Sequence, residues 1–420
     1  MNALALRDGR LADLSVLQRP ALARALALLD ANGEEARLVG GAVRDILLRR
    51  PPGDFDIATT ATPDEVIRRA KAAGIGHAPT GVAHGTVTLI LEGATIEATT
   101  LREDIETDGR RAKVRFGRDF RDDALRRDFT INALSIDAGG LVHDYTEGIA
   151  DLAAGRVRFI GDARLRIRED FLRILRFLRF SARFAEGRLD GEGFAAAIAE
   201  RAGLAGLSAE RIRAEFLKIL VAPHAARVVA EADGAGLLGL LVAGVLQPQR
   251  FQRLSAIEDA RGAAPDAVLR LAALAVQTRE DAARLRERLR LSNLECDRLD
   301  GAARALEGLH GLEAPPSLGD LRILLFERGR AGARDSMALA HAESRAAPDD
   351  ARWRSADRFL ADTPAPRLPF SGADLLARGL PPGRRVGLAL KTLQAKWIRA
   401  GFPREPEALA RLLEEAAAEC

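Results

Sequence analysis

The sequence predicts an α+β protein, with a mixed N-terminal module followed by a long region made of helices. Short segments rich in β-branched residues, a pattern typical of strands, concentrate in the first 142 residues. Beyond about residue 162, apolar residues recur at helical spacing among Ala, Leu and Arg. At 420 residues the chain also exceeds one ordinary domain of about 150 residues, so several units are expected.

The composition is that of a globular protein. Hydrophobic residues make up 47% and charged residues 29% of the chain, which excludes a disordered class. No stretch approaches the roughly 20 uncharged apolar residues of a membrane span, and the N-terminus lacks the apolar run of a signal sequence. We therefore expect a cytoplasmic protein with no membrane association. Cys296 and Cys420 are too isolated to indicate a disulfide framework or a zinc site.

The N-terminal module is expected to alternate helices with short strands. An Ala/Leu helix is predicted from about residue 12 to 36, and a strand at 37–39 then enters a glycine turn. Helices are predicted at 43–48 and 64–74, and strands at 55–60, 86–91 and 95–100.

The remainder is predicted to be helical. Gly and Pro clusters near 221–224, 262–265, 314–318 and 363–369 mark joints between its parts. The expected division is a head at 1–142, a neck at 143–230, a body at 231–345 and a tail at 346–420. The net charge of only +3 argues against binding polyanions through bulk charge alone.

Gly40 and Gly41 form the first candidate site. They follow a predicted strand and precede a helix, so backbone N–H groups and the positive helix end can bind a phosphate, with Arg44 adding a charged contact. A purely structural turn is the alternative reading.

Asp54, Asp56 and Glu97 form the second candidate group. The two aspartates alternate at the head of a predicted strand, so both carboxylates are expected on one face. Such a pair can share two Mg²⁺ ions about 3.5–4 Å apart, which activate an attacking hydroxyl and hold the leaving phosphate oxygens. Glu97 lies mid-strand and is a candidate third acid. A solvated sheet face is the structural alternative.

Four motifs in this order resemble the class II tRNA nucleotidyltransferases, which are CCA-adding enzymes, and the related bacterial poly(A) polymerases. They are Gly-Gly-Ala-Val-Arg-Asp at 40–45, Asp-Phe-Asp at 54–56, Arg-Arg-Asp-Phe-Thr-Ile-Asn-Ala at 126–133 and Glu-Asp-Phe-Leu-Arg-Ile-Leu-Arg at 169–176. Residues 207–212 are a fifth candidate. The resemblance implies a polymerase-β-like nucleotidyltransferase head followed by a helical neck, body and tail.

The resemblance also implies roles for individual residues. It makes Asp54 and Asp56 metal ligands, with Gly41 and Arg44 as triphosphate contacts. The third motif implies ribose and triphosphate contacts, which fall on Arg127, Asp128 and Asn132. Residues 102–118 match a mobile loop used in adding the terminal A, and Gly148 matches a hinge that would have local freedom.

Asp170, Arg173, Arg176 and Arg179 recur every third residue on a predicted helix, so Asp170 and Arg173 are expected side by side. Cytosine and adenine present an amine beside a ring-nitrogen acceptor. An aspartate acceptor beside an arginine donor therefore fits CTP and ATP and rejects UTP and GTP. Arg176 and Arg179 are expected to hold the triphosphate or orient the aspartate. An ordinary helix salt bridge is the alternative.

The predicted function is Mg²⁺-dependent addition of CMP and AMP to the 3′ end of tRNA, with CTP and ATP as substrates. Poly(A) polymerase and an A-adding specialist are the alternatives within the family. A catalytically silent RNA-binding scaffold and a small-molecule nucleotidyltransferase are alternatives from other classes. The acceptor region of tRNA is the expected partner, and no obligate protein partner is inferred.

The C-terminal region is predicted to contact RNA. A Gly/Pro turn at 379–383 precedes Arg384 and Arg385 and leads into a helix. Turn amides and arginines there can hold a nucleic-acid phosphate without reading sequence. A solvated helix connection explains the same residues equally well.

Overall fold

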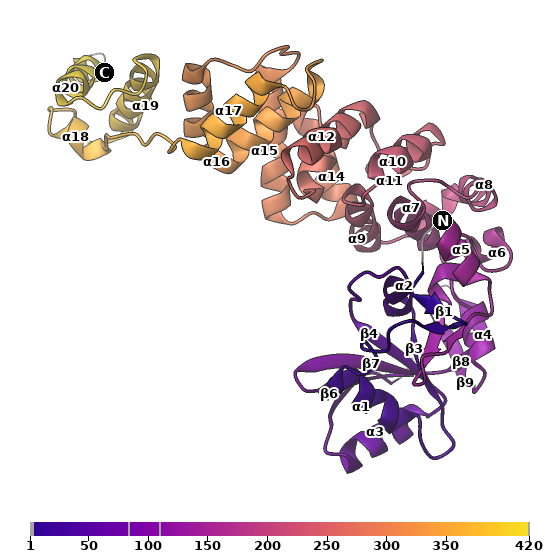
Figure 1. Cartoon of the computed structure of the whole chain (residues 1–420). Helices are drawn as coiled ribbons and strands as arrows, with labels where there is room; N and C mark the ends of the chain where they lie inside the picture. Colours follow the sequence, from indigo (N-terminus) through magenta and orange to yellow (C-terminus); the bar gives the residue numbers. More distant parts are fainter. Residues whose placement is uncertain (1–3, 83–84, 109–110, 419–420) are drawn as a thin grey trace. The chain divides into compact units, whose positions relative to one another are not determined.

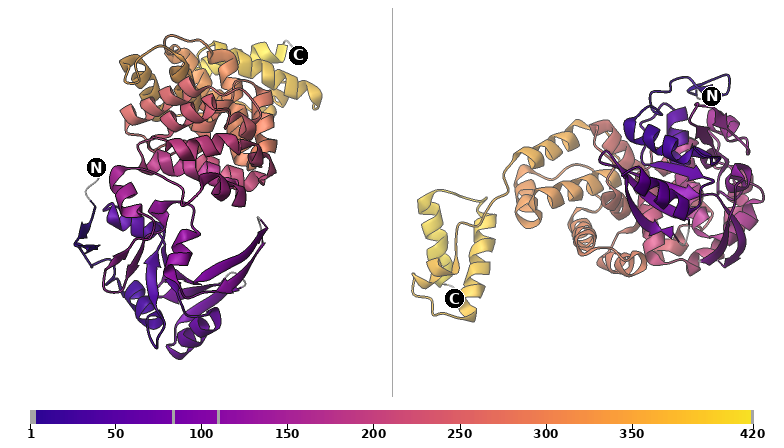
Figure 2. Two further views of the ribbon diagram at one scale, coloured as in Figure 1. Left: turned by 90° about the vertical axis from the view of Figure 1, so that its right-hand side faces the viewer. Right: turned by 90° about the horizontal axis from the view of Figure 1, so that it is seen from below.

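The computed structural model describes residues 4–82, 85–108 and 111–418. The chain divides into two compact units, Met1–Ala243 and Gly244–Cys420. Figures 1 and 2 show a mixed sheet with its helices in the first unit and helices in the second. The predicted α+β class is confirmed, whereas the finer boundaries at 142, 230 and 345 stay predictions.

A seven-stranded sheet of order β11-β10-β3-β4-β7-β6-β5 forms the base of the first unit. β4 and β7 run parallel, and the other neighbouring strands pair antiparallel. The strands are β3 (Ala36–Val39), β4 (Phe55–Thr59), β5 (Gly76–Gly81), β6 (Thr86–Leu91), β7 (Ala94–Thr100), β10 (Ser135–Asp137) and β11 (Val142–His143). β3 is buried throughout, which places it and β4 at the centre of the module.

Helices α1 (Pro20–Leu29) and α3 (Pro63–Ala72) cover one face of this sheet, because both contact β6 and β7 as well as each other. The predicted helix at 12–36 was wrong at both ends. α1 begins at Pro20, whose fixed φ suits a first turn, and the chain leaves the helix before Asn32 and Gly33, which have φ of 53° and 80°. Before α1, two short strands that were not predicted from the sequence, β1 (Leu6–Arg7) and β2 (Arg10–Leu11), pair with each other.

Residues 102–118 were expected as a loop, but they contain a two-stranded antiparallel hairpin. It consists of β8 (Arg102–Asp108) and β9 (Arg111–Phe116), with Arg102 opposite Phe116. Residues 109–110 lie outside the described residues. Alternating polar and apolar residues, as in Lys-Val-Arg-Phe at 113–116, favour strands over an irregular loop. A role of this segment in adding the terminal A stays a prediction.

The helices of the first unit other than α1 and α3 lie partly between the strands and partly after β11. These helical elements are α2 (Gly41–Leu47), α4 (Phe120–Leu125), a 3₁₀ turn at Thr130–Asn132, α5 (Gly148–Ala154), α6 (Ala163–Glu169), α7 (Leu172–Phe184), α8 (Gly191–Ala199), a 3₁₀ stretch at Arg201–Gly206, α9 (Ala209–Leu220), α10 (Ala225–Gly234) and α11 (Gly239–Val242). Phenylalanines fix α7 to the preceding chain. Phe129 lies 4.8 Å from Phe159 and 5.4 Å from Phe180 between ring centroids.

The second unit is helical throughout. Its helices are α12 (Pro248–Arg261), α13 (Ala267–Ala275), α14 (Arg279–Leu289), α15 (Asn293–Leu309), α16 (Leu318–Glu343), α17 (Ala351–Asp362), α18 (Gly372–Leu376), α19 (Arg384–Arg399) and α20 (Pro406–Ala418). One apolar core joins α16 to α17 around Trp353, and a second joins α18, α19 and α20 around Leu393. In the described part of the chain, no helix combines the length and the hydropathy needed to cross a bilayer.

Gly148, predicted to give local freedom to a hinge or else to form a plain connecting turn, is a site of close packing. A Cβ at this position would lie 2.3 Å from the backbone oxygen of Thr130 and 3.0 Å from Leu134 Cδ2. Its N–H donates to Asp144 Oδ1 over 2.9 Å. The glycine is required because α5 begins against the 3₁₀ turn that carries Asn132, and the predicted hinge role stays a prediction.

Gly148→Ala is expected to destabilise the first unit by about 1–3 kcal/mol, because the added methyl group overlaps backbone that cannot move away. The midpoint of urea unfolding measures this loss. Gly234→Ala is the matched control, since the space around a Cβ there is open to 4 Å and alanine is the better helix former. Equal midpoints for the two variants would contradict the packing role.

Candidate active site

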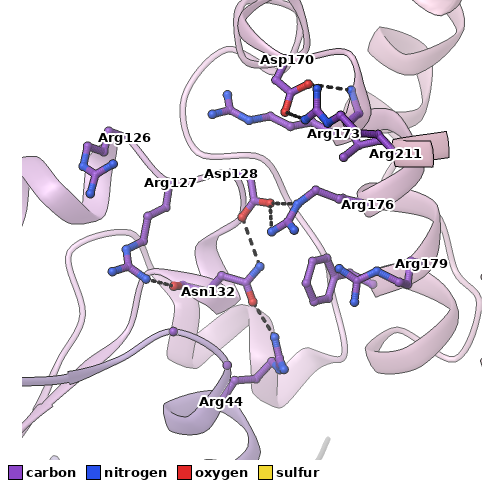
Figure 3. A pocket seen from close by; sticks show the side chains of 14 residues that line it. Arg44, Arg126, Arg127, Asp128, Asn132, Asp170, Arg173, Arg176, Arg179 and Arg211 are labelled. Atoms are coloured by element: carbon purple, nitrogen blue, oxygen red, sulfur yellow. Dashed lines mark hydrogen bonds and ion pairs between the residues drawn. The ribbon is translucent and has the colours of Figure 1, made fainter. Parts of the chain in front are cut away.

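A pocket of about 510 Å³ opens between the sheet module and α7 within the first unit. Seven of its fourteen lining residues are arginines and only two are aspartates, so the pocket suits an anionic ligand. Figure 3 shows these side chains directed into one space. The lining residues are Gly40, Gly41, Arg44, Arg126, Arg127, Asp128, Asn132, Asp170, Leu172, Arg173, Arg176, Arg179, Phe180 and Arg211.

The glycine turn forms the floor of the pocket. Gly40 has φ of 74° and ψ of −136°, a conformation that L side chains rarely adopt, and it precedes the first residue of α2. The position of its missing Cβ is 3.5 Å from Arg127 Nη1 and 3.9 Å from Asp56 Oδ2. Because α2 has only seven residues, we attribute the attraction for phosphate mainly to the arginines.

A hydrogen-bonded chain runs across the pocket from the head to α7 (Figure 3). Arg44 Nη1 donates to Asn132 Oδ1 over 2.6 Å, and Asn132 Nδ2 donates to Asp128 Oδ1 over 3.2 Å. Arg176 Nε donates to the other oxygen of Asp128 over 2.6 Å. This chain fixes Asp128, Asn132 and the sequence-distant Arg44, three of the predicted contact residues, relative to Arg176.

Burial lowers the pKa of Arg44 to about 10, although Asp45 beside it favours the charged form. The side chain is therefore charged at neutral pH but has little contact with water. Arg44, predicted as a charged phosphate contact, is 7% exposed and contributes a fixed, buried charge at the pocket wall.

Arg127 lies beside the glycine turn. Its guanidinium contacts Asp123 Oδ2 at 3.0 Å and donates to the backbone oxygen of Asn132 over 3.2 Å. Burial alone would favour a neutral Asp123, but the charges of Arg127 and Arg126 outweigh it and lower the pKa of this carboxyl. Asp123 therefore stays ionised and holds Arg127 in place.

The carboxylates lie next to this pocket. Asp56 pairs with Glu97 across the parallel strands β4 and β7. Burial, followed by repulsion from Glu97, raises the pKa of Asp56; Arg127 opposes this shift and Asp54 adds to it. Asp54 was predicted at the head of this strand; β4 begins at Phe55, and Asp54 is an exposed residue just before it.

These carboxylates fit a hard cation. Mg²⁺ is usually bound by one or two protein carboxylates together with substrate phosphates and water, and it would relieve the repulsion that raises the pKa of Asp56. Within the described ranges, no three acidic, histidine or cysteine side chains are arranged to hold one metal ion. A role of Glu97 as a third ligand therefore stays a prediction.

Asp170 is not on the helix that carries the arginines. It is the C-cap of α6, with φ of −157° and ψ of 107°, and α7 begins at Leu172. Its Oδ1 accepts from the N–H of Leu172 over 3.1 Å, so this short side chain interrupts one helix and starts the next. The predicted i, i+3 pair was wrong for this reason.

The ionic partners in the base-reading region also differ from the prediction. Asp170 Oδ2 accepts from Arg211 over 2.7 Å, while Arg173 donates to Glu169 and to the backbone oxygen of Arg166. Asp170 and Arg173 nevertheless line the same pocket. Arg179, also in the lining, pairs with Glu215 over 2.6 Å.

The comparisons with known proteins agree with this geometry. Residues 36–158 match the poly A polymerase head domain, and residues 190–245 match the probable RNA- and SrmB-binding site of polymerase A. The mitochondrial CCA tRNA nucleotidyltransferase 1 of Danio rerio is 33% identical over 413 residues, which cover 92% of this chain and 89% of that protein. The chain belongs to the CCA tRNA nucleotidyltransferase family.

Other relatives of this family agree. The Homo sapiens mitochondrial CCA tRNA nucleotidyltransferase 1 is 33% identical and matches over 90% of this chain and 86% of its own length. The solved CCA-adding enzyme of Bacillus stearothermophilus in complex with CTP is 27% identical, with a TM-score of 0.74 and coverage of 96% of this chain and 98% of that one.

Four lining residues of this family member were not predicted from its sequence. Arg126 and Leu172 lie inside quoted motifs, and Arg211 lies in the fifth candidate motif, but none was given a role. Their position in the motifs was the available signal. Phe180 lies outside the quoted motifs, and only its place in the fold brings it to the pocket.

Proposed function

We propose that this protein adds CMP and AMP from CTP and ATP to the 3′ end of tRNA and releases pyrophosphate. The observation that carries the proposal is one arginine-lined pocket with Gly40 and Asp56 at one side and Asp170 at another. Relatives that match nearly the whole chain are named for CCA addition to tRNA. We further propose the cytoplasm as its location, although these two relatives are mitochondrial proteins.

In this mechanism Asp54 and Asp56 would hold Mg²⁺. When bound, the ions supply Lewis-acid stabilisation for attack of the RNA 3′-hydroxyl on the α-phosphate and for departure of pyrophosphate. Gly40 keeps the turn free of side chains where the phosphates approach. Arg44 and Arg127, in the pocket lining, neutralise phosphate charge, and Asp128 and Asn132, also in the lining, contact the ribose.

Base choice is assigned to the α6–α7 junction. Asp170 accepts from the exocyclic amine of cytosine or adenine, and Arg173 donates to the ring nitrogen. Arg211 already holds one oxygen of Asp170, and the backbone of Leu172 holds the other, so the acceptor is oriented before a nucleotide binds. Uracil and guanine would instead place a ring N–H donor against the donor Arg173 and a carbonyl acceptor against the acceptor Asp170.

Pyrophosphate release tests the proposed reaction. We expect release from CTP and ATP only when Mg²⁺ and a tRNA lacking its terminal CCA are both present. Release with small hydroxyl or amine acceptors in place of tRNA would favour a small-molecule nucleotidyltransferase. A protein that binds tRNA but releases no pyrophosphate would be the silent scaffold, and the proposal would fail.

Arg384 and Arg385 are proposed to contact the RNA backbone, because both are exposed at the start of α19 after the turn at Gly383. Replacing both by alanine is expected to raise the Michaelis constant for tRNA by about three- to tenfold. It should also lower the salt slope, the slope of log affinity for tRNA against log salt concentration, by about one per lost phosphate contact. Arg352→Ala with Arg354→Ala, an exposed pair on α17, is the matched control. A salt slope equal to that of the control would refute the contact.

A further inference from the structure

Phe180 and Phe184 lie one turn apart on α7 and are surrounded by arginines. Their rings are stacked, with centroids 5.9 Å apart and an interplanar angle of 27°. Both side chains are nearly buried. Five guanidinium groups lie over these two rings, with distances from Cζ to the nearer centroid of 4.1 Å for Arg44, 4.2 Å for Arg179, 5.2 Å for Arg50, 5.4 Å for Arg176 and 5.4 Å for Arg183.

This arrangement places like charges close together, which costs electrostatic energy. Repulsion from Arg183 and Arg179 contributes to the low pKa of Arg44, after the larger effect of burial. Three of the arginines have a carboxylate partner: Arg44 contacts Asp45, Arg176 contacts Asp128 and Arg179 contacts Glu215. The negative faces of the phenylalanine rings supply a further attraction, which is largest for guanidinium groups with little access to water.

The rings also determine where the guanidinium groups point. Arg44 contacts both rings, at 4.1 Å from Phe184 and 5.3 Å from Phe180, and its Nη2 lies 3.4 Å from the place where a Cβ of Gly41 would be. Its guanidinium is thus held between an aromatic face and the glycine turn. Arg179, labelled in Figure 3, lies over the ring of Phe180 in the same way.

We propose that Phe180 and Phe184 are positioning residues for the triphosphate, because their faces hold Arg44 and Arg179 at the wall of the pocket. Phe180 itself lines the pocket with these two arginines. The proposal rests on the proposed function for its substrate, and it concerns the phosphate chain alone, not the base. Leucine at either position would fill much of the space but would offer no ring face to the cations.

The test measures binding of tripolyphosphate by calorimetry, without RNA or turnover, beside steady-state kinetics with CTP and ATP. Phe180→Leu and Phe184→Leu are expected to weaken tripolyphosphate binding by about three- to tenfold and to raise the KM for both nucleotides by the same factor. The kcat and the preference for CTP and ATP over UTP should change less than twofold, by the same reasoning. Phe180→Tyr keeps the ring face and should restore binding.

Phe177→Leu is the matched control. Phe177 is on the same helix, fully buried and stacked on Phe159 at 5.4 Å, and in the described chain no arginine lies over its ring. It should lower the melting temperature at least as much as Phe180→Leu and leave tripolyphosphate binding unchanged.

Equal loss of binding in Phe177→Leu, or wild-type binding in both Phe180→Leu and Phe184→Leu, would overturn the inference, as would a wild-type protein that does not bind tripolyphosphate. A wild-type protein that binds it, loses it in the two variants and yet incorporates no nucleotide would support the inference and contradict only the proposed function.

Discussion

Replacing Asp56 by alanine is expected to reduce nucleotide incorporation by about 1,000-fold or more, which corresponds to about 4 kcal/mol of transition-state stabilisation. The reason is that Asp56, which lies beside Gly40, would hold Mg²⁺ together with Asp54, and the bound ion would supply Lewis-acid stabilisation to the reacting phosphate. Single-turnover incorporation of labelled CMP at saturating CTP measures the loss. Asp54→Ala should give a loss of similar size.

The protein is expected to remain folded when the Asp56 carboxylate is removed. The raised pKa of Asp56 means that its charged form is disfavoured in the folded protein, so Asp56→Asn should melt at the wild-type temperature or above it at neutral pH in the absence of metal. Asp64→Ala is the control, because Asp64 is an exposed acid beyond the opposite end of β4. If Asp56→Asn retained wild-type incorporation, or if Asp64→Ala abolished it, the assignment of the metal-binding carboxylates would be wrong.

Asp170→Ala is expected to lower the preference for CTP over UTP by about 10- to 100-fold, from the cost of about 1–3 kcal/mol per unpaired polar contact. Arg173→Ala should act in the same direction. The ratio of kcat/KM for the four nucleotides on one tRNA measures the effect. Asp170→Asn keeps an oxygen for the N–H of Leu172 but presents an amide donor, so it should retain stability and still lose the preference.

Asp162→Ala separates base reading from loss of a helix cap. Asp162 caps α6, where its Oδ1 accepts from the N–H of Leu165 over 2.8 Å, and it is not in the pocket lining. Both alanine variants should lose about 1 kcal/mol of stability, but only Asp170→Ala should change nucleotide choice. A matching change in Asp162→Ala would show that the preference depends on helix stability and not on the carboxylate.

Sequence patterns were informative where a backbone requirement is local. The strand–Gly-Gly–helix order predicted a turn, and Gly40 has the positive φ that explains it. β-branched runs predicted β4, β6 and β7, and these strands bring Asp56 and Glu97 into register. The grouping of Arg44, Asn132 and Asp128 was expected from the motifs, and the structure places them in one hydrogen-bonded chain.

The sequence was less informative where two local tendencies compete or where contacts are distant. The apolar helical pattern continues across Asp170, so periodicity alone predicts one continuous helix there. The helix is broken because the Asp170 side chain accepts a hydrogen bond from the backbone N–H of Leu172. The ring faces of Phe180 and Phe184 meet arginines that come from two parts of the chain, and spacing gives no sign of that. Gly148 has an ordinary φ, and its need for glycine comes from the backbone of Thr130 and the side chain of Leu134.

The measurement that tests the central claim most directly is the product made on a tRNA that lacks its 3′ end, resolved nucleotide by nucleotide, with CTP alone, ATP alone and all four nucleotides. The account predicts two added C residues with CTP alone, and a single CCA end with all four nucleotides. Three results would contradict it. These are a long A tail, an activity limited to adding A to a tRNA that already ends in CC, and incorporation of U or G at rates comparable with those of C and A.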